Sequence, residues 1–120
     1  MEETDLGYFK VLLTTWLEEL RHSANNTVEG LLNVEMLSAD YLDWASFESD
    51  RSTALLILDR ESMLINKITK SLDDIDNGEY GICEDCGMEI AIARLKARPI
   101  ARRCIKCKTK QEALEKVMGI

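Results

Sequence analysis

The 120-residue sequence contains one proline, one histidine and few aromatic side chains, which make up 6% of it. Because helix breakers are so scarce, the chain favours long uninterrupted helices. The only histidine, His22, has no nucleophile in a recognised motif, so Ser-His-Asp or Cys-His catalysis is not expected. The longest wholly apolar run, residues 54–58, is too short to cross a bilayer, and residues 1–5 are acidic, unlike a signal peptide. We therefore expect a cytoplasmic protein that is not an enzyme.

Acidic side chains outnumber basic ones by 22 to 15, and the two kinds are unevenly distributed. Residues 1–80 contain 17 acidic and 6 basic side chains, whereas residues 81–120 contain 5 and 9. A protein that binds nucleic acid along its whole length would be basic. The asymmetry instead favours two functional parts. We place the first in residues 1–78 and the second in residues 79–120.

The spacing of apolar residues predicts two long helices. The first begins near Tyr8 with Asp5 as its N-cap, and the second spans roughly residues 46–76 and ends at Asn77-Gly78. The second follows a seven-residue repeat in which Glu61 is the one polar member. The predicted inner faces are Phe9, Leu13, Trp16, Leu20, Ala24, Val28 and Leu31 in the first helix, and Ala54, Leu58, Ile65, Ile68, Leu72 and Ile75 in the second.

The connection between these helices, residues 37–45, is short, so the helices should be antiparallel neighbours. We therefore expect a mainly α fold: a coiled-coil hairpin with its tip at about 37–45, a small cysteine-rich module, and a C-terminal helix. That last helix is expected over residues 108–118. Four of its apolar residues would be able to pack back: Ala113, Leu114, Val117 and Met118.

Four cysteines form two Cys-x-x-Cys pairs, Cys83 with Cys86 and Cys104 with Cys107, separated by 17 residues. Two residues between ligands let both thiolates reach one cation, and the long spacing is typical of a zinc site. A redox dithiol is the alternative, but such motifs open a helix in a βαβ context, and no strand-rich pattern is present. Four thiolates would fill the coordination sphere. We therefore predict one structural zinc, with tight turns at the flanking Gly81 and Gly87.

The residues around the cysteines resemble the zinc-finger signature of the DksA/TraR family. The zinc-finger likeness lies in the run 81–87, Ile90, Arg94-Leu95, Ala97-Arg98-Pro99 and the run 104–108. Residues 40–45 resemble the family's hairpin tip, Asp-Pro-x-Asp-x-Ala. It covers about residues 8–116 and is strongest to the longer, DksA-like members. The resemblance implies a regulator that binds bacterial RNA polymerase, inserts its coiled-coil tip into the secondary channel and modulates initiation, often with the alarmone ppGpp. We expect a monomer that does not read DNA sequence.

The resemblance also assigns roles to individual residues. The tip residues by position are Asp40, Asp43 and Ala45, and the ppGpp-binding positions are Arg60, Leu64, Lys67, Arg98 and Lys108. The chain departs from the family pattern at four positions. Tyr41 stands where the tip usually has proline, Trp44 is bulky, Met63 replaces a basic residue, and Lys106 replaces an acidic one. The last two departures leave ppGpp binding open.

Two other functions fit parts of the sequence. Residues 94–110 are rich in Arg and Lys, which is typical of a zinc-ribbon nucleic-acid binder, with the coiled coil as a dimerisation arm. That stretch has no aromatic residue on which a base could stack. A transcript-cleavage factor would also enter the secondary channel with an acidic tip. Residues such as Asp40 and Asp43 can also serve simply to cap a helix or solvate a turn.

Overall fold

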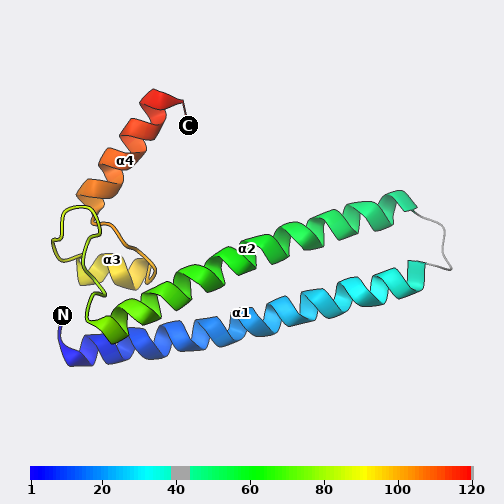
Figure 1. Ribbon diagram of the computed structural model, residues 1–120, viewed down its shortest axis with the longest axis horizontal. Coiled ribbons are helices and arrows are strands. Elements are labelled where there is room, and N and C mark those ends of the chain that lie inside the picture. The colour runs from blue at the N-terminus through cyan, green and yellow to red at the C-terminus, as the bar shows by residue number, and fades with distance from the viewer. Residues whose placement is uncertain (39–43, 120) are drawn as a thin grey trace. The chain divides into compact units, whose positions relative to one another are not determined.

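The computed structural model describes residues 1–38 and 44–119, and the side chains of residues 1–32 and 48–119. Its four helices are α1 (Glu3–Ser38), α2 (Trp44–Asn77), α3 (Ile92–Ala97) and α4 (Ile105–Met118) (Figure 1). Within the described ranges no strand forms, and the only β-type pairing is an isolated bridge between Ile82 and Glu89. The predicted mainly α fold with two long helices is therefore confirmed. No described helix combines the length and the apolar character needed to cross a membrane.

The chain divides into two compact units, which are described separately. The first contains Met1–Leu13 and Lys70–Ile120, and the second is Thr14–Thr69. In the second unit α1 and α2 run antiparallel and side by side (Figure 1), which confirms the predicted hairpin. We call this unit the hairpin unit and the first the zinc-finger unit.

The hairpin unit has a thin core because two helices have no third layer to cover them. Leu17 and Ile68 are buried, while Leu20 and Leu58 are only half-buried. Glu61, the polar member of the repeat, accepts a hydrogen bond at 3.0 Å from the Ser23 hydroxyl. This bond gives the polar residue at this position of the repeat a partner on α1.

The predicted inner face of α1 is wrong at one position. Val28 is 42% exposed, and Thr27 is half-buried in its place. Residues three or four positions apart in a helix lie near the same face. After Ala24 the next inner residue comes three positions later, at Thr27, and not four positions later, at Val28. Leu17, which the predicted set omitted, is buried. The tip segment 39–43 lies outside the described residues.

The start of α1 differs from the prediction, whereas the end of α2 agrees with it. Helix α1 begins at Glu3, so Asp5 lies in its first turn and is not the N-cap. A carboxylate there is stabilised by the positive end of the helix dipole. Helix α2 ends at Asn77, and Gly78 follows with φ 74°. The Glu79 N–H then donates to the Asp74 carbonyl at 2.8 Å, which closes the helix end as predicted.

The core of the zinc-finger unit joins the start of α1 to the cysteine-rich segment. Phe9 and Tyr80 are buried with ring centroids 5.5 Å apart. The Tyr80 hydroxyl donates to the Pro99 carbonyl at 2.7 Å. Further buried apolar side chains are Leu13, Ile90, Leu95 and Ile100. This core anchors the chain before the first cysteine pair and between the two pairs.

The prediction that the C-terminal helix packs back is wrong. Helix α4 starts earlier than expected, at Ile105, and Leu114, Val117 and Met118 are 60%, 85% and 63% exposed. Ala113 is exposed as well. The half-buried side chains of α4 are instead Cys107, Lys108, Gln111 and Glu115. Helix α4 is therefore attached to the rest of the zinc-finger unit through its first turns and a face of mostly polar side chains.

Candidate metal centre

The first cysteine pair lies in a tight loop after α2. The Cys83 N–H donates to the Met88 carbonyl at 2.8 Å, and the Gly87 N–H donates back to the Cys83 carbonyl at 3.0 Å. Gly81 and Gly87 have φ of 81° and 72°, a region that residues with a Cβ rarely adopt. The sequence prediction of tight turns at both glycines is confirmed. The loop turns Cys86 back toward Cys83.

The second cysteine pair opens α4. Cys104 is the N-cap residue, with φ −67° and ψ 164°, and its carbonyl accepts the Lys108 N–H at 3.0 Å. Cys107 lies one turn along the same helix. A loop and a helix N-terminus thus each supply two sulfur atoms, and the core residues between the pairs hold them facing one another.

The four sulfur atoms of Cys83, Cys86, Cys104 and Cys107 lie within 4.8 Å of one another. The Sγ atoms of Cys86 and Cys104 are 3.7 Å apart. Two thiolates bound tetrahedrally to zinc at about 2.3 Å would lie about 3.8 Å apart. The spacing and the all-sulfur donor set therefore fit a zinc ion. Four sulfur ligands leave no position open for a substrate or a reactive water, so a zinc held here is structural.

The protonation of the thiols differs across the cluster. Burial raises the pKa of Cys83, but hydrogen bonds from the backbone of Cys104, Cys86 and Asp85 outweigh it and bring the value to about 6. The hydrogen bond with the Cys104 side chain raises the pKa of Cys107 to about 12. Thiolates, not thiols, bind zinc. Metal binding should therefore release protons.

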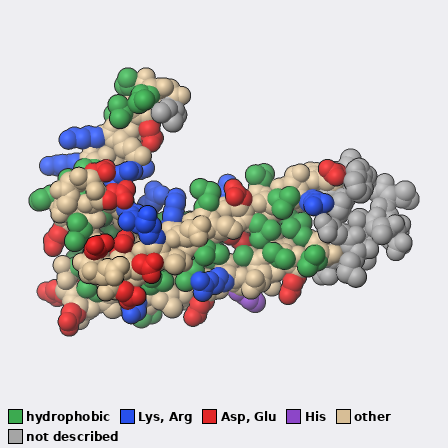
Figure 2. Space-filling view, viewed as in Figure 1, with side chains coloured by type: hydrophobic (Ala, Val, Ile, Leu, Met, Phe, Trp, Pro, Cys, Tyr) green, Lys and Arg blue, Asp and Glu red, His purple; other side chains and the backbone are tan. Residues whose placement is uncertain are grey.

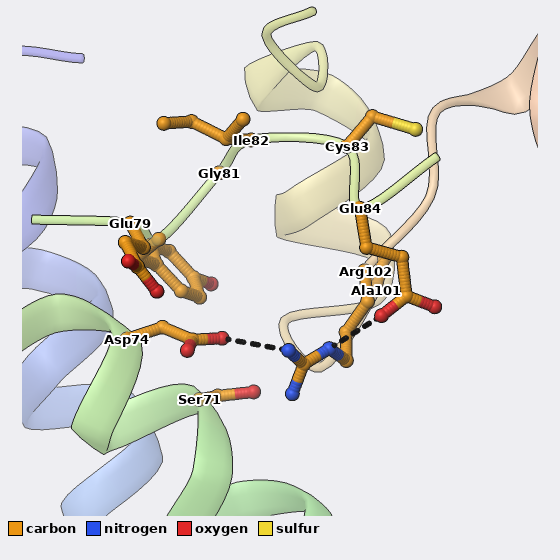
Figure 3. Close-up of a pocket in the computed structure, with 10 residues that line it drawn as sticks. Ser71, Asp74, Glu79, Gly81, Ile82, Cys83, Glu84, Ala101 and Arg102 are labelled. Carbon is orange, nitrogen blue, oxygen red and sulfur yellow. Dashed lines mark hydrogen bonds and ion pairs between the residues drawn. The ribbon is translucent and has the colours of Figure 1, made fainter. Parts of the chain in front are cut away.

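A network of ion pairs links the two cysteine pairs. Arg102 lies between the Glu84 carboxylate, at 3.1 Å, and the Asp74 carboxylate of α2, at 3.6 Å, as Figure 3 shows at the wall of a cavity of about 270 Å³. Arg103 contacts Asp85 at 2.8 Å and Glu84 at 3.3 Å. The two acids between the first cysteines thus face the two arginines before Cys104. Sequence reasoning missed this network, although the adjacent acidic and basic pairs were a visible signal.

The basic stretch 94–110 is partly used within the molecule. Arg94 donates through Nε to the Arg103 carbonyl at 2.9 Å, and Arg103 also hydrogen-bonds the Gln111 side chain of α4. Arg94 also lines a second cavity of about 830 Å³ beside α3 and α4, together with Arg98, Lys106 and Lys110. Because Arg102 and Arg103 are committed to carboxylates, this stretch offers fewer free cations to nucleic acid than its composition suggests.

The positions assigned from the family resemblance fall in different parts of the structure. Asp40 and Asp43, with Tyr41, lie outside the described residues. Ala45 and Trp44 lie in the first turn of α2, and their side chains are outside the described part.

The ppGpp positions are divided between the units. Arg60, Leu64 and Lys67 belong to the hairpin unit, at helical spacing along one side of α2, with both cations exposed and Leu64 half-buried. Arg98, exposed, and Lys108, half-buried, belong to the zinc-finger unit. Three of the five therefore belong to the hairpin unit and two to the zinc-finger unit.

Comparison with known proteins identifies the class. Residues 5–75 match the family model of the DnaK suppressor protein DksA N-terminal domain, and residues 78–113 match the prokaryotic dksA/traR C4-type zinc finger. The RNA polymerase-binding transcription factor DksA of Salmonella typhimurium is 42% identical over 119 residues, which cover 99% of this chain and 79% of that protein. The protein of the same name in Caulobacter vibrioides is 38% identical over 117 residues, which cover 98% and 82%.

A solved structure agrees with the sequence comparisons. The transcription factor DksA2 from Pseudomonas aeruginosa superposes with a TM-score of 0.91 at 35% identity, covering 97% of this chain and 89% of that one. The long helices and the four-thiolate cluster thus define a helical protein with a C4 zinc finger and one structural zinc. The chain belongs to the DksA/TraR family.

Proposed function

We propose that this chain is a transcription regulator that binds RNA polymerase directly. The observation that carries the proposal is the 42% identity, over almost the whole chain, to a protein named RNA polymerase-binding transcription factor DksA. Both family models match, and together they span the hairpin and the zinc finger. In this proposal the protein acts as a monomer in the cytoplasm and has no catalytic activity of its own.

We further propose that the hairpin enters the secondary channel of the polymerase. Two paired helices form a narrow element with little interior, which suits insertion into a channel. Thr14–Thr69 carries ten acidic and four basic side chains, so DNA phosphates would repel it. Residues 1–78 would supply the hairpin, and residues 79–120 the zinc finger that docks at the channel rim.

Within the proposed mechanism the tip acts through charge and size. Asp43, supported by Asp40, would present a carboxylate near the active centre of the polymerase, where metal ions and basic side chains respond to it. Ala45 would be kept small so that the tip can approach closely. The zinc, held by Cys83, Cys86, Cys104 and Cys107, would fix the base of the hairpin and take no part in chemistry.

Transcription in vitro with purified polymerase tests the tip. Asp43→Asn should abolish promoter regulation while binding to the polymerase persists, because the substitution removes charge and preserves shape. Asp50→Asn, at an exposed position of α2 beyond the tip segment, is the matched control and should regulate normally. Unchanged regulation by the Asp43 variant would refute the tip mechanism.

We also propose that ppGpp acts with the protein through Arg60, Leu64, Lys67, Arg98 and Lys108. Arginine and lysine side chains are suited to phosphate groups, and Arg60, Lys67 and Arg98 are exposed. Met63 is 54% exposed and Lys106 lines the cavity beside α3 and α4.

A further inference from the structure

The cavity of about 830 Å³ beside α3 and α4 lies within the zinc-finger unit. Its apolar lining comes from Met88 and Ile105, which are 68% and 67% exposed, and from three alanines at positions 91, 93 and 97. The short alanine side chains leave space that longer ones would fill. Small-molecule sites in proteins are mostly apolar hollows of about 300–1,000 Å³. The cavity therefore has the size and the lining of a ligand site.

Two pairs of basic side chains face this cavity. Arg94 of α3 and Arg98, the C-cap residue of that helix, are four positions apart, and so are Lys106 and Lys110 in the first turns of α4. Residues four positions apart in a helix lie near the same face, and both members of each pair line the cavity. Among the described residues that line it, Glu89 is the only acidic one. Figure 2 shows basic side chains gathered around the start of α4.

The fold uses only one of these four cations. Arg94 donates through Nε to the Arg103 carbonyl, which positions its guanidinium group. Within the described residues, Arg98, Lys106 and Lys110 are exposed and form no ion pair with a carboxylate. Like charges around one cavity repel one another. Such an arrangement gives the folded chain nothing, and it is what a site that binds an anion requires.

The zinc centre sets the charge that such an anion should carry. Three of the four cysteines also line the cavity: Cys86, Cys104 and Cys107. A zinc dication held by four thiolates has two negative charges in excess. Together with the Glu89 carboxylate, this excess cancels three of the four cations that line the cavity. One positive charge remains, which matches a ligand with a single negative charge.

We propose that this cavity binds a small monocarboxylate with an apolar body. The carboxylate would pair with Lys106 and Lys110 through charge-assisted hydrogen bonds, and the apolar body would remove Met88 and Ile105 from water. A phosphate monoester suits the cavity less well, because it carries about −1.5 to −2 at neutral pH. The inference does not depend on the proposed function, because it needs only a folded finger that holds zinc.

The cavity is distinct from the assigned ppGpp positions, of which only Arg98 lines it. Lys108 is two positions from Lys106, so the two project from different sides of α4. It is half-buried, and its Nζ lies 3.5 Å from the Gln111 side-chain oxygen. The other three assigned positions belong to the hairpin unit. A ligand in the cavity would therefore leave most of the assigned ppGpp positions uncovered.

Calorimetric titration of the full zinc-loaded chain with decanoate tests the proposal. Decanoate should bind with one molecule per chain. Acetate has the carboxylate without the apolar body, and decanol has the body without the charge. Each should bind at least about tenfold more weakly than decanoate. The affinity for decanoate should also fall as the salt concentration rises, because part of it comes from ion pairing.

Matched substitutions locate the binding. Lys106→Gln together with Lys110→Gln should weaken decanoate binding by about tenfold. Lys116→Gln, at an exposed position of α4 outside the cavity, should leave it within about twofold. Met88→Gln should weaken it by about fivefold, whereas Leu114→Gln, at a position of α4 that is 60% exposed, should not. One zinc per chain in every variant, by elemental analysis, would show that the finger remains folded.

Several outcomes would overturn the proposal. Failure of decanoate to bind would do so directly, and so would equal binding of decanol. Equal losses in Lys116→Gln and in the double variant would show a diffuse attraction of anions to the finger. Displacement of decanoate by an equal concentration of ppGpp or of a short DNA duplex would assign the cavity to phosphate groups. None of these results bears on the tip mechanism, which the Asp43 variant tests separately.

Discussion

At the scale of single residues, the zinc finger depends on side chains that touch no metal. Arg103 contacts Asp85 and Glu84 beside the first cysteine pair, precedes Cys104 of the second pair, and reaches Gln111 of α4. One guanidinium thus joins three segments that must converge on the cation. Such surrounding contacts orient metal ligands and affect metal affinity.

Arg103→Gln should therefore weaken the zinc finger without removing a ligand. We expect a loss of about 1 kcal/mol in the free energy of unfolding, as is typical when a network of partly exposed ion pairs is broken. Zinc should also pass faster to a competing chelator. Lys10→Gln, which breaks the exposed 3.4 Å pair with Asp76, is the control and should do neither measurably. Identical chelator kinetics in both variants would show that the network does not hold the metal site.

The raised pKa of Tyr80 predicts that the folded protein loses stability in alkali. Burial raises the pKa of Tyr80 from 10.0 to about 12. Between these values the unfolded chain loses its phenolic proton while the folded protein keeps it. The free energy of unfolding should therefore be unaffected by this group below pH 10 and fall as the pH rises toward 12.

Substitution of the same residue tests this prediction. Tyr80→Phe removes the 2.7 Å hydrogen bond to the Pro99 carbonyl and should cost about 1 kcal/mol at neutral pH. It should also reduce the decline in alkali, which denaturant titration across the pH range would measure. Tyr8→Phe changes a ring that is 53% exposed and should leave both properties as in the native protein. A decline of equal size in the Tyr80 variant would assign it to other groups.

At the scale of elements, the two cysteine pairs join segments that share a small core. Bound zinc contributes roughly 10–16 kcal/mol of apparent free energy in zinc-finger peptides, which is large against the few buried side chains between Tyr80 and Ile100. The long helices have a separate source of stability in the α1–α2 interface. The finger should therefore be more sensitive to metal loss than the hairpin.

Cys83→Ser should unfold the finger and spare the hairpin. Cys83 is 2% exposed and lies at the centre of the loop hydrogen bonds, so its loss removes both a ligand and a packed side chain. Elemental analysis should find one zinc per native chain and none in the variant. Far-ultraviolet circular dichroism should keep most of its helical signal, because α1 and α2 hold 36 and 34 residues. One zinc retained per variant chain would contradict the four-cysteine site.

The elements that follow local chemistry could be predicted from the sequence. The C-terminus of α2 is determined by Gly78, and the loops around the first cysteine pair by Gly81 and Gly87. The exposure of the apolar side chains of α4 could not be predicted. Apolar spacing shows which residues share a face of a helix, but it does not show whether another element covers that face. The choice of Thr27 over Val28 on the inner face of α1 likewise depends on how α1 is rotated against α2, which apolar spacing alone does not determine.

At the scale of the whole molecule, the separation of charge follows the structure in the basic side chains only. The hairpin unit carries ten acidic and four basic side chains, whereas the zinc-finger unit carries twelve acidic and eleven basic ones. Composition indicated that division, but it could not show that Arg102 and Arg103 are occupied by carboxylates. That finding required the fold, since Asp74 and Arg102 are 28 positions apart and meet at 3.6 Å.

The proposed ppGpp response makes a prediction that involves both units. If the alarmone acts through the assigned cations, Lys67→Ala in the hairpin unit and Arg98→Ala in the zinc-finger unit should each lose the ppGpp-dependent part of promoter regulation. Regulation without ppGpp should remain, because neither residue lies at the tip. Lys110→Ala removes a neighbouring exposed cation that lines the same cavity as Arg98 and should respond normally. In vitro transcription with and without ppGpp would measure all four proteins.

The pattern of losses would distinguish a defined phosphate site from a general electrostatic effect. A defined site loses its response at the assigned positions and keeps it at Lys110, because bound phosphate groups require cations at particular places. A diffuse field would lose a similar fraction at all three positions, and the loss would shrink as salt screens the charges. A native protein that shows no ppGpp response at all would overturn the proposed ppGpp site.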